Sequence, residues 1–201
     1  MRSLLQAWSS GLEQEFEARL LWAAACLVFF GFMRSGEFTL PDQKASPSIT
    51  AADVELIPPT APTSIRVFLR RAKADPFGKG VNIFLGQSLN EICPVTALSN
   101  YMSRRPSQPS QGPLFIHEDG SPLLKAQFVK KVKRALAHQN IDSSKYSGHS
   151  LRIGAATAAA AAAAGVPDHM IKMMGRWESS AYLLYVRTPR EALAAISKRL
   201  I

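Results

Sequence analysis

Apolar residues recur along the chain at the spacings that distinguish helices from strands. A spacing of three to four residues marks residues 3–17, where Leu4, Trp8 and Leu12 fall on one side of a predicted amphipathic helix. Residues 20–32 are apolar all round, which predicts a buried central helix. Because about 20 residues are needed to span a bilayer, this run is too short for a membrane segment.

The same patterns predict the remaining elements. Two β-type runs, 65–69 and 81–85, are separated by a basic stretch with one proline and two glycines, which predicts a hairpin with a long loop. Residues 41–63 are rich in Pro, Ser and Thr and are expected to be irregular, apart from a short helix or strand near 54–57. We expect further helices at 94–103, 124–138, 148–164, 167–174 and 189–200, and a short strand at 113–116. The predicted fold class is mainly α with a small antiparallel β-sheet (α+β).

Positive charge is concentrated in the last third of the chain. Of the 201 residues, 1–120 carry 11 Lys and Arg against 11 Asp and Glu, so the formal net charge of +9 lies within 121–201. A basic surface on one part of a fold is typical of a partner that is a polyanion, most often nucleic acid. A soluble basic protein without such a partner is the alternative.

The predicted helix 124–138 carries much of this charge. Phe128, Val132 and Leu136 line one side of it, and the rest is basic without any acidic residue. This composition favours contact with a DNA backbone over a merely solvated face. The basic residues concerned are Lys125, Lys130, Lys131, Lys133 and Arg134.

The two cysteines indicate neither a disulfide framework nor a metal site. Cys26 lies in the apolar run and Cys93 precedes a proline, without metal-ligand spacing. A reducing compartment is expected, the nucleus if the source is eukaryotic and otherwise the cytoplasm.

Three short stretches near the C-terminus carry residues suited to phosphate chemistry. In Gly148-His149-Ser150-Leu151-Arg152, the histidine and arginine are three residues apart, so on a helix they would share a face. Such a pair suits a site that holds a phosphate and moves a proton beside it. Gly175-Arg176-Trp177 and Tyr185-Val186-Arg187 follow, and a tyrosine hydroxyl can attack phosphorus and become covalently attached.

A charged pair also follows the central helix. Arg34 and Glu37 emerge directly from the most apolar element, and Gly36 is expected to break the backbone between them. Charge at such a place is costly unless it is paired or used. A helix-terminal ion pair is one interpretation, and part of a phosphate site is the other.

These stretches together resemble the tyrosine recombinase (phage integrase) family. Residues 30–37 resemble its first arginine box, 69–75 resemble its β-hairpin box with a lysine, and His149 and Arg152 match its second box. Trp177 falls where the family has His or Trp, and Tyr185 falls at the nucleophile. In amino-acid sequence, residues 146–157, 175–177 and 184–189 are most similar to recombinases of eukaryotic mobile elements, DIRS-type retrotransposons above all.

The resemblance implies the family's catalytic-domain fold for residues 1–201 as a single domain. A short N-terminal helix is expected in 1–18 and a C-terminal helix in 189–201, and the separate N-terminal core-binding domain is expected to be absent. The implied partner is double-stranded DNA, with no cofactor, no metal and no membrane. Because recombinases act as tetramers, the C-terminal helix is expected to dock on a neighbouring copy.

The resemblance also implies a role for each residue. Arg34 and Arg152 would stabilise charge on the phosphate, and Glu37 would orient Arg34 or the neighbouring backbone. His149 would accept the proton of Tyr185, and Lys73 would protonate the leaving 5′-oxygen. The Trp177 indole would donate to a phosphate oxygen. Residues implied to contact DNA are Arg70, Arg71, Lys79, Lys130, Lys131, Lys133, Arg134, Arg176 and Arg187.

The sequence departs from the family in one spacing. Arg152 to Gly165 is 13 residues, all but the last in an alanine-rich helix. This is about two residues longer than the family usually has, and two residues turn a helix by about 200°. An inactive DNA-binding remnant therefore remains as an alternative to an active recombinase. A type IB topoisomerase, which uses the same arginine, lysine and tyrosine chemistry, is the other alternative. Tyr182 remains the alternative nucleophile.

Overall fold

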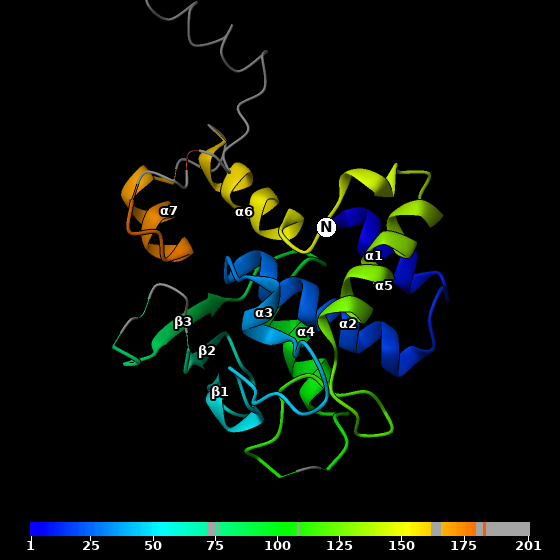
Figure 1. Cartoon of the computed structure of the whole chain (residues 1–201), viewed down its shortest axis with the longest axis horizontal. Coiled ribbons are helices and arrows are strands. Elements are labelled where there is room, and N and C mark those ends of the chain that lie inside the picture. The colour runs from blue at the N-terminus through cyan, green and yellow to red at the C-terminus, as the bar shows by residue number, and fades with distance from the viewer. Residues whose placement is uncertain (72–74, 76, 108, 162–165, 180–182, 184–201) are drawn as a thin grey trace, which may run out of the picture.

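The computed structural model describes residues 1–71, 75, 77–107, 109–161, 166–179 and 183. Along this part of the chain three α-helices come first, three consecutive strands follow, and four more α-helices complete it (Figure 1). In order they are α1 (Arg2–Ser9), α2 (Glu15–Phe30), α3 (Ser35–Phe38), a 3₁₀ turn η1 (Ala51–Asp53), β1 (Val54–Ile57), β2 (Ser64–Leu69), β3 (Val81–Gly86), α4 (Pro94–Met102), α5 (Lys125–His138), a 3₁₀ turn η2 (Ser143–Lys145), α6 (Ser150–Ala160) and α7 (Asp168–Gly175).

Helix α2 is the central helix that the sequence predicts. Its buried residues run from Leu20 to Val28 with a single gap, and it packs against α1, α4 and α6. The helix ends at Phe30, and the chain turns away at Phe32, which takes a left-handed φ of 49°. A Cβ on the intervening Gly31 would lie 2.7 Å from the carbonyl oxygen of Leu27, so the close approach there favours glycine. The predicted break at Gly36 is wrong, since this residue lies inside α3.

The N-terminal segment forms two helices where the sequence predicts one over residues 3–17. Helix α1 stops at Ser9, and the hydroxyl of Ser10 donates to the carbonyl of Ala7. Gly11 then takes a φ of 85°, a left-handed conformation that glycine adopts without strain. The chain turns there and re-enters a helix at Glu15.

The sheet is an antiparallel meander in the order β1-β2-β3, so the predicted hairpin of β2 and β3 is confirmed. Ile65, Val67 and Leu69 of β2 face the core, in alternation with polar or half-exposed residues. The predicted strand at 113–116 is instead a pair of isolated bridges, Thr50 with Pro113 and Ile116 with Pro122. Proline has no N–H to extend a ladder, which explains why no strand develops.

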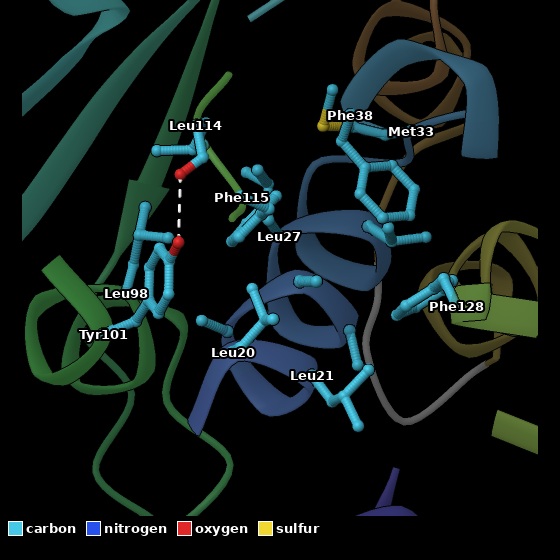
Figure 2. Close-up of a cluster of buried hydrophobic side chains, with 14 of the residues drawn as sticks. Leu20, Leu21, Leu27, Met33, Phe38, Leu98, Tyr101, Leu114, Phe115 and Phe128 are labelled. Atoms are coloured by element: carbon cyan, nitrogen blue, oxygen red, sulfur yellow. Dashed lines mark hydrogen bonds between the residues drawn. The ribbon is translucent and has the colours of Figure 1, made fainter. Parts of the chain in front are cut away.

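The main hydrophobic core surrounds α2. Figure 2 shows Leu20, Leu21 and Leu27 on this helix, surrounded by side chains from the other elements. The phenol of Tyr101 is buried there, where its hydroxyl donates to the carbonyl of Leu114 at 3.1 Å and accepts the N–H of Ile116 at 2.9 Å. These bonds attach the segment after α4 to the core.

A smaller second cluster joins α6 and α7 to the end of α2. It consists of Phe32, Ala155, Ala156, Ile171 and Trp177. The two helices lie beside each other at one end of the molecule (Figure 1). The prediction that the alanine run stays helical to residue 164 is wrong, because α6 ends at Ala160 and Ala161 is extended and exposed.

The described part of the chain matches the predicted fold class, with helices and one three-stranded antiparallel sheet. None of its helices has the length and apolar character to cross a membrane.

Candidate active site

The turn between α2 and α3 presents the first arginine. Phe32 takes a positive φ of 49°, and the chain then enters α3, with Arg34 as the residue before the helix. The N–H of Arg34 donates to Oε2 of Glu37 at 2.8 Å, and Nη1 of Arg34 donates to Oε1 at 2.9 Å. The expected ion pair therefore forms. The Arg34 side chain stays 24% exposed, while that of Glu37 is 6% exposed.

Arg176 is the second partner of Glu37. It follows α7 in a left-handed conformation (φ 55°), and its Nη2 donates to Oε2 of Glu37 at 2.8 Å. Its Nη1 donates to the carbonyl of Gly31 at 3.0 Å and its Nη2 to that of Phe32 at 3.2 Å. Burial lowers the pKa of Arg176, and the Glu37 charge opposes this effect. The structure thus places Arg176, expected to contact DNA, in a buried ion pair.

Arg152 of α6 is fully buried, at 1% exposure. Nη2 donates to the carbonyl of Gly175 at 2.5 Å, and Nη1 donates to the carbonyl of Phe32. The guanidinium carbon lies 4.3 Å from the centre of the Trp177 ring, which is a cation–π contact. This arrangement joins α6 to both the α2–α3 turn and the end of α7.

Trp177 belongs to the second hydrophobic cluster. Its ring meets that of Phe32 edge to face, with centroids 6.2 Å apart. It also covers Gly175 so closely that a Cβ there would overlap the six-membered part of the indole. The tryptophan that was expected to face a phosphate is 8% exposed and packs against Arg152.

His149 lies at the start of α6. It is the N-cap residue, whereas the sequence predicts a helix from residue 148 with His149 inside it. The hydroxyl of Ser147 accepts the N–H of His149, at 3.3 Å. His149 is exposed and Arg152 is buried, so the two do not share one solvent-facing side.

The segment carrying His149 contacts the segment carrying Arg34. A Cβ on Gly148 would lie 2.9 Å from Oγ of Ser35, so the backbone at Gly148 packs directly on α3. Three stretches that are far apart in sequence, 32–37, 148–152 and 175–177, therefore meet at the α2–α3 turn. Tyr185, Tyr182, Lys73 and Arg187 lie outside the described residues, as does the predicted helix 189–200.

The loop after Lys73 is anchored at its far end. Oδ2 of Asp75 accepts the N–H of Gly80 at 2.6 Å, and Oδ1 accepts the N–H of Lys79 at 3.2 Å. Gly80 has a φ of 72°, and a Cβ there would run into the ring of Phe68. Lys79 is exposed, with its ammonium 5.8 Å from the centre of the Phe77 ring.

The expected DNA-binding residues of α5 fall into two groups. Lys130 and Lys133, with Lys125, line a groove of about 730 Å³ that Tyr146 and Gly148 complete, next to His149. Lys131 and Arg134 point elsewhere and pair with one carboxylate. The ammonium of Lys131 lies 2.5 Å from Oε2 of Glu13, and Nη1 of Arg134 lies 3.2 Å from its Oε1.

The two arginines that follow β2 lie in different surroundings. Nε of Arg70 donates to both oxygens of buried Asp53, at 2.8 and 2.9 Å. Its Nη2 donates to the hydroxyl of Thr50 and to the amide oxygen of Gln111. Arg71, the next residue, is exposed.

Sequence reasoning missed the acceptors that hold these basic residues. Asp53 lies 17 residues before Arg70, Glu13 lies 118 before Lys131, and Glu37 lies 139 before Arg176. A local pattern carries no signal for pairs so far apart, so their side chains looked available for DNA. For Glu37 alone, a signal existed in its position directly after the most apolar helix.

Residues 81–186 match the model of the phage integrase family. The chain belongs to this family. The match takes in His149, Arg152, Trp177 and Tyr185, and it begins after Arg34 and Lys73. A search of curated proteins found no match.

Solved structures share the fold across nearly the whole chain. The XerH site-specific recombinase in a post-cleavage complex with its difH substrate is similar at a TM-score of 0.72 and 16% identity, over 98% of this chain and 49% of that one. The XerA recombinase gives 0.69 and 18%, over 98% and 60%. The Tn1549 transposon integrase in complex with circular intermediate DNA gives 0.57 and 14%, over 96% and 62%.

This phage integrase family member therefore has the expected fold, that of the recombinase catalytic domain. It spans about half to three fifths of the length of the solved proteins that it resembles.

Proposed function

We propose that this domain cleaves and rejoins duplex DNA through a covalent 3′-phosphotyrosyl intermediate, as a site-specific recombinase. The observation that carries the proposal is the meeting of three basic stretches at the α2–α3 turn. Arg34 is half-buried there beside Glu37, and Gly148 brings the His149 segment against Ser35. A guanidinium on one segment and an exposed imidazole on the segment packed against it suit a site that binds a phosphodiester and moves a proton.

The proposed reaction balances without a cofactor. Oη of Tyr185 bonds to phosphorus as the bond from phosphorus to the 5′-oxygen breaks. His149 takes the tyrosine proton, and Lys73 gives a proton to the departing oxygen. Arg34 and Arg152 stabilise the charge that grows on the non-bridging oxygens, which lowers the transition state more than the ground state. Rejoining is the reverse step with a 5′-hydroxyl from another strand.

The groove beside α5 supports DNA as the partner. Lys125, Lys130 and Lys133 line it, and Gly148 connects it to the His149 segment. A row of lysines is suited to successive phosphates of a backbone, and such contacts are independent of sequence. We place the duplex along this groove, with the scissile phosphate near Arg34.

A second function is favoured by one observation. Arg152 directs Nη1 and Nη2 to main-chain carbonyls and is 1% exposed, which suits a structural arginine better than one that binds phosphate. A domain in this state would bind DNA through the α5 groove without cutting it. The alternative is therefore an inactive DNA-binding remnant of a recombinase.

A nicked duplex that traps the covalent adduct separates these two functions. Because the target sequence is unknown, a mixture of sequences is used at low salt. The attached residue is then mapped by mass spectrometry of the peptides. An adduct on Tyr185 that disappears in Tyr185→Phe and persists in Tyr182→Phe supports the enzyme.

The opposite results are equally informative. An adduct on Tyr182 contradicts the assigned nucleophile while keeping the reaction. Salt-sensitive binding to DNA without any adduct supports the remnant.

The origin and assembly form part of the same proposal. The amino-acid sequence of residues 146–157 and 175–177 supports descent from a mobile element of the DIRS type. The Tn1549 transposon integrase shares the fold. We infer a tetramer on DNA, with residues 189–201 docking on a neighbouring copy. Deletion of 189–201 would then leave DNA binding by one copy intact and abolish the larger complex in a gel-shift assay.

A further inference from the structure

We propose that Arg176 is a positioning residue, which sets the Arg34 guanidinium through their shared acceptor, Glu37. This inference rests on the proposed function, because it concerns how Arg34 is presented to a phosphate. It changes the role of Arg176 from a DNA contact to a part of the protein that DNA does not touch.

The carboxylate of Glu37 is divided between the two arginines. Oε1 takes the Nη1 proton of Arg34 at 2.9 Å. Oε2 takes the Nη2 proton of Arg176 at 2.8 Å and the main-chain N–H of Arg34, also at 2.8 Å. With Oε2 occupied in this way, Arg34 meets only one carboxylate oxygen with its side chain.

Burial makes the two sides of this arrangement unequal. The side chains of Arg176 and Glu37 are 7% and 6% exposed, whereas that of Arg34 is 24% exposed. A guanidinium has five N–H donors. Among the described residues, the Arg34 side chain donates to Glu37 alone, so its remaining donors are available to a ligand.

The charges around Glu37 determine which of the two arginines points towards solvent. Arg34 and Arg176 carry two positive charges around one carboxylate, so each guanidinium repels the other across Glu37. The buried guanidinium of Arg176 is fixed by the carbonyls of Gly31 and Phe32. The exposed guanidinium of Arg34 is therefore the one that is directed outward.

Loss of Arg176 would remove its bond to Glu37 and its bonds to the main chain of the α2–α3 turn. Oε2 of Glu37 would become free to take a second bond from Arg34, which would draw that guanidinium inward as a two-bond pair. The turn before Arg34 would also lose two hydrogen bonds to its carbonyls. A displacement of about 1 Å in a group that binds the transition state costs about 100-fold in rate.

The test compares Arg176→Gln with wild type in the nicked-duplex assay. We expect the cleavage rate at saturating DNA to fall about 100-fold, while the affinity for DNA stays within about 3-fold, because a buried arginine makes no phosphate contact. Glu37→Gln should lower the rate similarly. The double variant should be no slower than either single variant, since residues in one network are not additive.

Two variants separate positioning from a general loss of structure. Arg176→Lys keeps a charge beside Glu37 and should recover part of the rate, and it keeps the inference testable if Arg176→Gln does not fold. Lys172→Gln removes a positive charge from the same helix and should cleave at the wild-type rate.

A second experiment follows the Arg34 side chain directly and does not depend on DNA cleavage. The side-chain N–H signals of Arg34 are followed by nitrogen-15 NMR in the free protein, and we expect them to shift in Arg176→Gln and stay in place in Lys172→Gln. Unchanged Arg34 signals overturn the inference, whether or not the chain cuts DNA. A wild-type cleavage rate in Arg176→Gln, or a loss confined to DNA affinity, overturns it as well. An absent wild-type adduct with shifted Arg34 signals contradicts the proposed function and keeps the positioning role.

Discussion

The guanidinium of Arg152 lies over the ring of Trp177, with its carbon 4.3 Å from the ring centre. The same arginine donates to the carbonyls of Phe32 and Gly175, so one buried side chain joins α6, α7 and the turn after α2. The tryptophan supplies the apolar surface on which that cation rests. The two residues act as one unit, and the consequences of changing either are therefore coupled.

Replacing Trp177 by alanine should open α7. The indole fills much of a small cluster, and Trp→Ala changes in a core cost about 3 kcal/mol or more. We expect the amide protons of α7 to exchange with solvent about 100-fold faster, since each 1.4 kcal/mol is a factor of about ten. Trp177→Phe keeps a ring beside Arg152 and should show a smaller effect. Unchanged exchange in Trp177→Ala would contradict the packing described.

Gly175→Ala should destabilise the domain by about 1–3 kcal/mol, because its Cβ would overlap the Trp177 ring. The matched control is Gly36→Ala, at another helical glycine where nothing lies within 4 Å of the new Cβ. That change should be neutral or slightly stabilising, as expected for a compatible backbone. Urea denaturation of both variants measures the difference, and equal effects would argue against it.

Arg70 and Arg71 are neighbours with different expected effects. Arg70→Gln removes the cation that faces buried Asp53 and should lower the free energy of unfolding by about 2 kcal/mol, the scale of hydrogen bonds to a charged group. Arg71→Gln should leave stability unchanged and weaken DNA binding. Thermal melting and a fluorescence titration with duplex DNA give the two readouts. A stable Arg70→Gln with weakened DNA binding would reverse our assignment.

The α5 groove predicts which lysines contribute to the salt dependence of DNA binding. Lys130→Gln and Lys133→Gln should each reduce the slope of log K against log salt by about 0.9, the value for one phosphate contact. Lys131→Gln is the control on the same helix, because Lys131 already pairs with Glu13. Its slope should be that of wild type. An equal loss from all three would mean that the helix contributes charge without a defined groove.

His117 and Glu17 predict how stability depends on pH. The hydrogen bond to Glu17 raises the pKa of His117 above its usual 6.5. Burial alone would raise the pKa of Glu17, but the hydrogen bond and charge of His117 and the charge of Lys131 outweigh it and hold that pKa below 4.5. The Nδ1 to Oε2 distance is 2.9 Å.

His117 and Glu17 stabilise the folded state over opposite sides of the pH range. The contribution of His117 is complete below pH 6.5 and is lost as the pH rises through its raised pKa, while that of Glu17 is lost as the pH falls below 4.5. Stability from this pair should therefore be highest between those values. The unfolding free energy should fall from pH 6 to pH 8 more steeply in wild type than in His117→Gln. The exposed His138→Gln should behave as wild type.

The sequence predicts helices and strands well where the hydrophobic periodicity is strong, and less well where a turn determines the end of a helix. Helix α5 and the hairpin of β2 and β3 follow from their apolar spacing. The single helix predicted over 3–17 fails at Gly11, because an apolar spacing continues across a left-handed turn that the pattern does not record. The break placed at Gly36 fails because the chain turns at the left-handed Phe32, and Gly36 lies inside α3.

The candidate site was predictable in its residue types and not in its contacts. Arg34, Glu37, His149 and Arg152 were singled out from their chemistry and from the resemblance, and the structure brings their segments together. Which arginine faces solvent could not be predicted, because that depends on acceptors more than 100 residues away, as for Arg176. Whether Lys73 and Tyr185 have their expected roles stays a prediction.

Three of the acceptors that hold Arg152 and Arg176 are main-chain carbonyls, those of Gly31, Phe32 and Gly175. A carbonyl is present whatever side chain the codon specifies. Mutational drift at position 32 can therefore change the side chain without removing an acceptor, provided the backbone keeps its shape. The donors are the side chains of Arg152 and Arg176, so a substitution at either position removes the hydrogen bonds. Across diverging descendants of this gene, we expect the two arginines and the close-packed glycines to persist while the residue at 32 varies among apolar types.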